Sequence, residues 1–301
     1  MAVKAVSFTL NGQTYNLALD AASGQYKATI TAPATTSWNA NSDHKYHGTV
    51  QVQDEAGNKV TATVTDFSTL GLRVLEKDPP TIAVSYPTAG AYLTNSKPAI
   101  KWTVEDTGSG ANQDSISIKI DSGTAITSGI TKTATANGYT CTYTPSTALA
   151  EGAHTITINA EDNDGNVATA ATVTFAVDTV PPTLSITAPA NGLITNQSKI
   201  TVSGTTNDVT SSPVTVSIKV NGGAAITPTV GTGGAFSTQV NLTEGSNTIT
   251  IVATDSAGKT TTVTRTVTLD TNAPTITAIT LTPNPVDAGK TFIISVTVSD
   301  T

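Results

Sequence analysis

Short runs of alternating apolar and polar residues make up most of this chain. Residues 5–19, AVSFTLNGQTYNLAL, hold two such runs joined by Asn-Gly, the preferred two-residue turn of a β-hairpin. Val, Ile, Thr and Ser dominate the later runs as well, and these residues suit strands. No segment shows the apolar periodicity of a long amphipathic helix. The pattern predicts an all-β protein that begins with a hairpin.

Turn residues divide the middle of the chain into strands at the spacing of a β-sandwich. We expect one set of strands at Thr81–Ser85, Ala99–Glu105, Ser115–Ile120, Tyr139–Tyr143, His154–Glu161 and Ala168–Val177. A second set is expected at Lys199–Gly204, Val214–Val220, Phe236–Leu242, Asn247–Thr254 and Thr260–Leu269. Trp102 alternates with Ile100 and Val104, so it is predicted to lie in a sandwich core.

Proline-containing junctions recur along the chain. The sequences KDPPT, DTVPPT and DTNAPT place Pro80, Pro182 and Pro274 before a threonine, at separations of about 100 and about 90 residues, which are Ig-sandwich lengths. After the first two junctions the sequences run in parallel: IAVSYPTAGAYLTNSKPAIKWTV begins at Ile82 and LSITAPANGLITNQSKITVSG at Leu184. The junctions therefore separate copies of one unit.

These repeats predict four segments. Residues 1–77 form an atypical N-terminal β-sandwich domain, residues 78–179 and 180–271 form Ig-like domains, and residues 272–301 begin a further Ig-like domain that is incomplete. Each linker is short and has proline at its centre, which fixes one backbone angle. We therefore expect tandem immunoglobulin-like β-sandwiches in an extended file.

Composition and charge argue against nucleic acids as binding partners and against insertion into a membrane. The net charge is -7, the isoelectric point is near 4.8, and Lys and Arg are scattered singly, which argues against a nucleic-acid partner. No apolar run approaches the roughly 20 residues of a membrane helix, so no membrane insertion is expected. The single cysteine, Cys141, alternates with Tyr139 and Tyr143 on one face of an expected strand. It is predicted to be a buried packing residue and not a nucleophile.

An acidic turn recurs as DEAGN from Asp54, DNDGN from Asp162 and DSAGK from Asp255. Glycine stands at the same place in each because it adopts positive φ freely, which indicates a hairpin turn. The loop from Asp162 is no EF-hand, since Val167 and Val173 occupy the positions where that loop needs Gly and Glu. A hairpin turn in each unit is enough to explain why these acids recur, so the acids do not by themselves require a cofactor.

The turns and junctions together resemble a known family. NAEDNDGN followed by FAVDTVPPT, and VATDSAGK followed by VTLDTNAPT, resemble the bacterial Ig-like repeats of large adhesins and of phage tail proteins, with Lys259 where the pattern has Asn. The resemblance covers residues 80–275 well. It implies β-sandwich domains that serve as spacers, as decorations or as ligand-binding domains. The matching motifs are specific for the fold but only weakly indicate the function.

The resemblance also implies a metal, because such adhesin repeats hold calcium at some domain junctions with the turn acids and the aspartate of the DT pair. Asp162, Asp164 and Asp178 would then be ligands at one junction, and Asp255 and Asp270 at the next. Carboxylates are the hard oxygen donors that calcium takes. Turn residues alone and turn residues that bind calcium are both open at this point.

Other candidate chemistry lies in a polar loop of the first segment. His44 and His47 in SDHKYH suggest a metal site or solvated side chains, and Trp38 with Tyr46 suggests a surface that contacts a partner protein or stacks on a glycan. The alternative for Trp38 is that it folds back over the first domain. His154 stands alone, and no Ser-His-Asp arrangement or phosphate-binding loop is present, so no enzyme is predicted.

The start of the chain bears on function. Met1 leads into the hairpin without a signal peptide, which indicates assembly in the host cytoplasm. With the resemblance, this predicts a phage tail-associated structural protein of the virion that braces or decorates the particle. Its expected partners are other virion or tail proteins, further copies of itself, and a host-surface glycan or protein used in host attachment. The alternatives are a spacer or stalk segment of an adhesin on the bacterial cell surface, and an accessory region of a carbohydrate-active enzyme.

Overall fold

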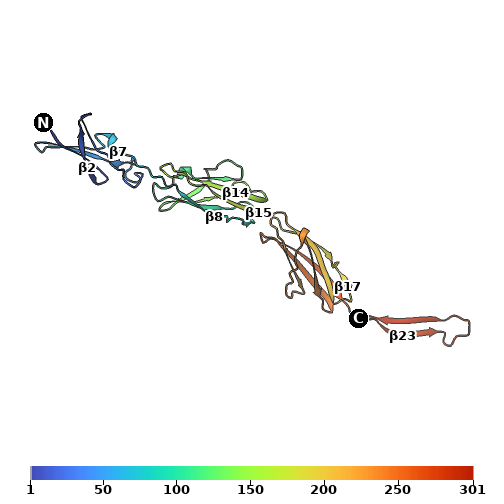
Figure 1. Ribbon diagram of the computed structural model, residues 1–301. Coiled ribbons are helices and arrows are strands. Elements are labelled where there is room, and N and C mark those ends of the chain that lie inside the picture. The colour runs from blue at the N-terminus through green and yellow to red at the C-terminus, as the bar shows by residue number, and fades with distance from the viewer. Residues whose placement is uncertain (1, 301) are drawn as a thin grey trace. The chain divides into compact units, whose positions relative to one another are not determined.

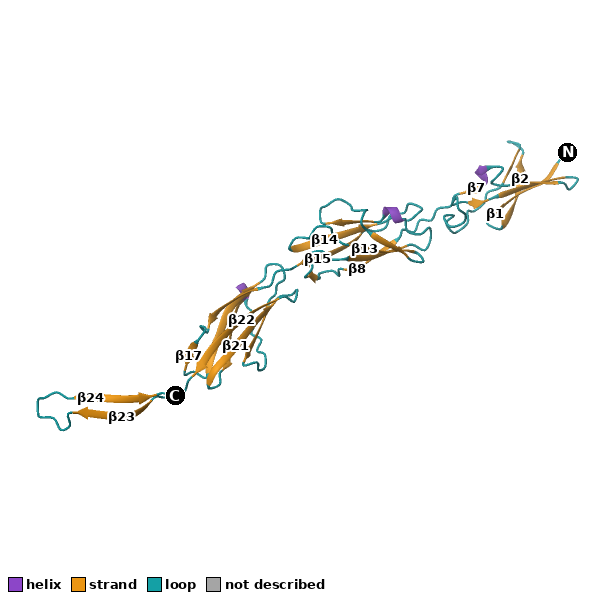
Figure 2. Ribbon diagram, turned by 180° about the vertical axis from the view of Figure 1, so that it is seen from behind, coloured by secondary structure: helices purple, strands orange, loops and turns teal. Residues whose placement is uncertain are grey.

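Strands account for nearly all the regular structure, as Figure 1 and Figure 2 show. The structure is a computed structural model that describes residues 2–300. Its helical residues form single 3-10 turns at Ser68–Leu70, Gln113–Ser115 and Thr232–Gly234. No helix among residues 2–300 has the length and apolar content needed to cross a bilayer. The all-β prediction is confirmed, and the chain divides into two compact units, Met1–Val177 and Asp178–Thr301.

The first segment is a curled antiparallel sheet with a small core. Its strands are β1 (Val3–Leu10), β2 (Gln13–Asp20), β3 (Gln25–Lys27), β5 (Thr49–Asp54) and β6 (Lys59–Ala62), in the order β3-β2-β1-β5-β6. A separate ribbon pairs β4 (Tyr46–His47) with β7 (Gly71–Leu72). Asn11 and Gly12 take φ values of 46° and 76°, so the predicted Asn-Gly turn joins β1 to β2. Val6 and Leu10 are the buried hydrophobic residues of this segment, which therefore has little of a sandwich core.

The second segment is a two-sheet sandwich. One sheet has the order β12-β13-β10-β8 and the other β11-β14-β15-β9. Their bounds are β8 (Thr81–Tyr86), β9 (Tyr92–Leu93), β10 (Ile100–Glu105), β11 (Ser117–Ile120), β12 (Thr131–Ala134), β13 (Gly138–Tyr143), β14 (Gly152–Asn159) and β15 (Ala171–Val177). Trp102 and Cys141 are fully buried against Ile118, Ile156 and Phe175 of the facing sheet, which confirms their predicted core positions.

The third segment repeats this plan. Its sheets have the orders β16-β18-β20 and β17-β22-β21-β19. The bounds are β16 (Thr183–Ala188), β17 (Leu193–Thr195), β18 (Lys199–Asn207), β19 (Thr215–Val220), β20 (Ala235–Asn241), β21 (Gly245–Thr254) and β22 (Thr260–Leu269). Val202, Ile218, Ile249 and Val267 fill the core. Gly204 is needed where β18 pairs with β16 beside a register shift, because a Cβ there would overlap the Ser185 carbonyl.

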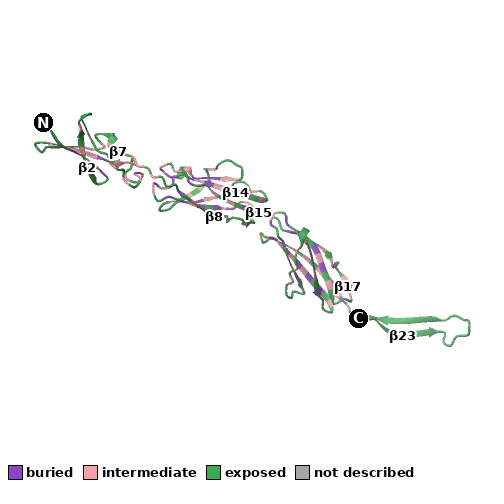
Figure 3. Ribbon diagram, in the orientation of Figure 1, coloured by how far each residue is buried: buried purple, intermediate pink, exposed green. Residues whose placement is uncertain are grey.

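The last segment is a lone hairpin of β23 (Thr275–Thr282) and β24 (Ile293–Ser299). Its register pairs Ile276 with Val298 and Ile279 with Val296, as in the first strand pair of each sandwich. No second sheet covers it among the described residues, and Figure 3 colours it as exposed throughout.

Three loops meet at one end of each sandwich. In the second segment they are the linker before β8, the loop directly after β10 and the turn between β14 and β15. The third segment uses the linker before β16, the loop after β18 and the turn between β21 and β22. The repeated acids of the sequence lie in these loops, so the fold itself gathers them.

Candidate functional site

Two groups of three carboxylates occupy these loop clusters. The first group is Glu76, Asp106 and Asp162, and its ligand atoms all lie within 4.8 Å of one another. The second group, which meets the same criterion, is Asp178, Asp208 and Asp255. The members correspond in order: a linker acid, an acid that follows the second strand, and the acid that opens the hairpin turn. We call these the first and the second acidic cluster.

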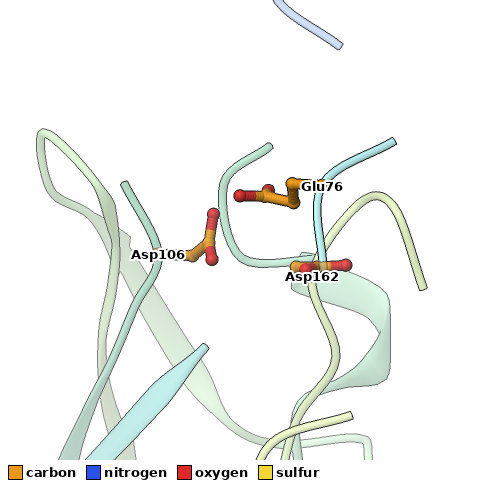
Figure 4. A group of neighbouring side chains, drawn as sticks. All are labelled: Glu76, Asp106 and Asp162. Carbon is orange, nitrogen blue, oxygen red and sulfur yellow. The ribbon is translucent and has the colours of Figure 1, made fainter. Parts of the chain in front are cut away.

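Backbone amides hold the first cluster in place. Asp106 Oδ1 accepts the N–H groups of Gly108 at 2.9 Å and of Gly110 at 2.7 Å, and Glu76 accepts the N–H of Ser109. Figure 4 shows the Glu76 and Asp106 carboxylates pointing toward one another. A Cβ at Gly108 would overlap the Glu76 carboxylate, so glycine leaves the room that this acid fills. The loop is therefore shaped around the linker carboxylate.

Asp162 is capped by its own turn. Its Oδ1 accepts the N–H groups of Asp164 at 2.9 Å and Asn166 at 2.8 Å, and its Oδ2 accepts Asn166 Nδ2 at 2.6 Å. The first segment repeats this arrangement, where Asn58 Nδ2 donates to Asp54 at 2.9 Å. The asparagine that ends the D-x-x-G-N turn thus satisfies the second oxygen of the aspartate that begins it.

The second cluster is more deeply buried. Asp178, Asp208 and Asp255 have relative exposures of 0%, 7% and 6%. Asp178 accepts the Val180 N–H at 3.1 Å and the Ser211 hydroxyl, and Asp208 Oδ1 accepts the Ser211 N–H at 2.7 Å. None of the ion pairs within residues 2–300 includes these three carboxylates. Three close acids are therefore buried without a basic side chain to balance them, which is costly unless another positive charge is supplied.

One oxygen of this cluster is orphaned. Asp255 Oδ1 accepts the Lys259 N–H at 2.8 Å, but Asp255 Oδ2 is buried and has no hydrogen-bond partner among the described residues. Lys259 stands where Asn166 and Asn58 stand in the other turns, and lysine offers no amide to this oxygen. The one departure from the turn pattern has thus left an acceptor open inside an acidic cluster. Hard oxygen donors in this state fit a divalent cation such as calcium.

The structure brings together some of the predicted ligands and separates others. Asp162 belongs to the first cluster, and Asp178 and Asp255 belong to the second. The Asp164 side chain is fully buried and pairs with Arg73. Asp270 lies in neither cluster, and its Oδ1 accepts the Asn272 N–H at 3.1 Å.

The sequence analysis missed Glu76, Asp106 and Asp208. Each had a signal: Glu76 occupies the place of Asp178 when the prolines of the two linkers are aligned, and Asp106 and Asp208 follow corresponding strands, β10 and β18. Reading the repeats position by position would have found all three.

The Trp38 loop packs on the end of the first segment. The Trp38 and His44 rings are stacked, with centroids 3.8 Å apart and an interplanar angle of 5°, and the Arg73 guanidinium lies 4.9 Å from the Trp38 ring centroid. The Tyr46 hydroxyl is 2.6 Å from Thr35 Oγ1. Trp38 is only half-buried, so a contact with a glycan or protein partner stays a prediction.

The two histidines of the SDHKYH sequence do not converge on one point. His44 Nδ1 lies 2.7 Å from the Trp38 carbonyl, and His47 Nε2 lies 3.0 Å from Asp43 Oδ1 at the surface. Neither residue belongs to a potential metal-binding group among residues 2–300. The geometry places His44 in the stack with Trp38 and His47 in a surface pair.

Two other titratable groups belong to the sandwich of the second segment. Burial raises the pKa of the Cys141 thiol to about 11, which keeps it protonated and unreactive at neutral pH. His154 is buried, with Nε2 2.9 Å from the Ala150 carbonyl and Nδ1 2.8 Å from Asp121 Oδ2. Burial opposes its charge, but these two acceptors raise the pKa of His154 above its ordinary value. Its role is to stabilise a strand entrance.

Comparisons with known proteins agree with this architecture. Residues 93–179 match the model of a bacterial Ig-like domain, and residues 182–271 match that of domain B of glucodextranase. A comparison with curated protein sequences finds no match.

Similar solved structures include fibronectin(III)-like modules of Clostridium thermocellum CbhA, with 19% identity over 63% of this chain and 94% of that one, at a TM-score of 0.38. Titin domains A168-A170 show 14% identity over 87% and 85% of the two chains at 0.40. Immunoglobulin domains 1-5 of Sidekick-1 show 14% identity over 92% and 56% at 0.39. These scores carry no argument about function.

Ig-like domains of the kind that residues 93–179 match are typically non-catalytic. The repeated sandwiches, their shared strand order and the match of residues 93–179 to a bacterial Ig-like domain support a tandem Ig-like architecture, which is typical of surface or structural modules.

Proposed function

We propose that the protein is a non-catalytic structural module whose Ig-like domains are stiffened at one end by divalent cations. The observation that carries this proposal is the repetition of the acidic cluster at the same end of two sandwiches. Each cluster joins a linker acid to two loops of the domain that follows the linker. Such a contact fixes the linker to its own domain.

Calcium is the cation that the donor set fits best. Glu76, Asp106 and Asp162 would hold it in the first cluster, and Asp178, Asp208 and Asp255 in the second. The orphaned Asp255 Oδ2 supports this proposal, because a buried carboxylate oxygen without a donor is satisfied by a metal ion. A bound ion would supply the positive charge that the described residues of the second cluster lack.

A melting experiment tests the cation. We expect calcium to raise the melting temperature of both compact units of the chelator-treated protein, and Asp178→Ala to remove the increase in the unit that holds the second cluster. Asp270→Ala is the matched control, because Asp270 directly follows β22 as Asp178 follows β15, but it lies in neither cluster. An unchanged melt in excess chelator would leave the acids as turn residues alone.

The assembly that we propose for the module is a phage particle, with a tail-associated position as a structural protein. The proposed partners are other virion or tail proteins, copies of the same chain in a ring or trimer, and a glycan or protein of the host surface. The half-buried Trp38 and the small core of the first segment support its use as an anchoring segment. The alternative is a stalk segment of a bacterial surface adhesin.

Mass spectrometry of purified particles separates these assemblies. The chain should be present in intact virions at a stoichiometry that matches a symmetric assembly. Its absence from virions, together with its presence in a bacterial cell-wall fraction free of phage, would replace the phage assignment with the adhesin.

A further inference from the structure

An arginine lies beside the first acidic cluster. Arg73 Nη2 pairs with Asp164 Oδ1, and Asp164 Oδ2 accepts the Glu76 N–H at 3.1 Å. Asp164 and Asp162 belong to the same turn, and the Asp162 Oδ1 accepts the Asp164 N–H at 2.9 Å. The Asp164 carboxylate therefore contacts the backbone of Glu76, and the backbone of Asp164 contacts the Asp162 carboxylate.

The first segment holds Arg73 in this position. Arg73 Nη1 donates to the His44 carbonyl at 2.9 Å, and the guanidinium lies 4.9 Å from the centroid of the Trp38 ring, which is stacked on His44. Thr36 Oγ1 donates to Asp164 Oδ2 at 2.5 Å. The charge beside the cluster is thus fixed by aromatic and hydrogen-bonding contacts from the loop around Trp38.

Among residues 2–300, the second cluster has no comparable ion pair beside it. Ala257 occupies the place of Asp164 in its turn, and its carboxylates take part in none of the ion pairs of residues 2–300. Each cluster has three acids, but the residues around the two clusters differ. The difference is the pair between the partly exposed Arg73 and the buried Asp164 side chain.

We infer that Arg73 is an internal counter-cation that sets the divalent-cation affinity of the first cluster by neutralising Asp164. This inference rests on the proposed cation role of the clusters. Arg73 is a positioning residue and not a ligand. Its ion pair with Asp164 keeps that carboxylate from binding the cation, and its guanidinium places a positive charge beside the ion. The loop around Trp38 thereby gives the first segment control over the junction that follows it.

The sign of the effect follows from charge. Replacing Arg73 with a neutral residue leaves Asp164 as an uncompensated carboxylate next to Asp162, so a cation should bind more tightly. Replacing Asp164 with asparagine leaves Arg73 uncompensated, so a cation should bind less tightly. Removing both charges should return the affinity close to its starting value. A merely structural role for the pair predicts losses in every variant.

Isothermal titration with calcium chloride tests the inference. The starting protein is the full chain carrying Asp255→Asn, which removes a ligand of the second cluster so that the first can be followed alone. On this background we expect Arg73→Met to increase the affinity on the order of tenfold and Asp164→Asn to decrease it by a similar factor. The double variant should lie between them, and Arg73→Lys, which keeps the charge, should stay close to the starting protein.

Terbium luminescence gives a second readout. Trp38 and Asp106 line the same recess, so Trp38 is placed to sensitise an ion in the first cluster. Arg73→Met should shift the terbium titration to lower concentration, and far-ultraviolet circular dichroism checks that the variant is folded.

Three outcomes would overturn the inference. A folded Arg73→Met protein with unchanged or weaker calcium affinity would do so, as would a double variant as weak as the weaker single variant. If wild-type protein binds calcium but no protein on the Asp255→Asn background does, the inference fails while the second cluster stands as proposed. If no protein, wild type included, binds calcium, the proposed cation role fails and the inference falls with it.

Discussion

Replacing Lys259 with asparagine should stabilise the C-terminal unit when no divalent cation is present. Asp255 Oδ2 is buried without a partner, whereas Asp162 Oδ2 accepts from Asn166 Nδ2 at 2.6 Å. Asparagine at position 259 would present the same amide to Asp255. A buried polar group without a partner costs about 1–3 kcal/mol, so we expect Lys259→Asn to raise the free energy of unfolding by about 1–2 kcal/mol.

The assay has to report on the C-terminal unit alone. Trp38 and Trp102 both lie in the N-terminal unit, so their fluorescence is insensitive to this change. Hydrogen exchange of the β21 and β22 amides, measured by mass spectrometry on the full chain in chelator and increasing urea, gives the local free energy of opening. Lys259→Asn should move the protection of these strands to higher urea concentration.

Lys259→Met is the matched control, because it removes the same positive charge and offers no amide. It should leave the protection of β21 and β22 at or below the wild-type level. The reciprocal change, Asn166→Lys, should destabilise the turn between β14 and β15 by about 1–3 kcal/mol. If Lys259→Asn and Lys259→Met behave alike, the orphaned oxygen does not carry the cost assigned to it.

Three further changes test the packing and the titratable groups. Trp102→Ala should destabilise the second segment by about 3–5 kcal/mol, because its fully buried ring fills the core, and urea unfolding followed by circular dichroism measures this. Gly204→Ala should cost about 1–3 kcal/mol in the same assay, because the added Cβ meets the Ser185 carbonyl. The raised pKa of His154 means that its contribution is full below its unfolded pKa, near 6.5, and is lost as pH rises through the folded pKa. His154→Gln should therefore lower the melting temperature at pH 5.5 more than at pH 8.5.

Local signals predicted most strands of the two sandwiches and the core residues of the second segment. Alternation placed Trp102 and Cys141 inside, and the Asn11-Gly12 pair marked the first hairpin because both residues accept positive φ. Strands β12 and β16 were not predicted, and neither were the short edge strands β9 and β17. Strands β9 and β17 have only two or three residues each and pair in parallel with a strand far along the chain, so no local pattern distinguishes them from loops.

The acidic clusters were predictable only in part. Asp162, Asp178 and Asp255 stand in repeated motifs, which drew attention to them. Asp106 and Asp208 follow ordinary strands, and their approach to the turn acids depends on how the two sheets of a sandwich pack. The pairing of Asp164 with Arg73 joins residues from two different segments, and nothing in either local sequence indicates it.

The central claim is that each acidic cluster holds one divalent cation, and equilibrium dialysis against calcium tests it most directly. Chelator-treated wild-type protein should bind two calcium ions per chain at saturation, one for each cluster. Asp208→Asn should reduce this to one, because Asp208 belongs to the second cluster alone. No bound calcium in the wild-type protein, or the same amount in wild type and Asp208→Asn, would contradict the account.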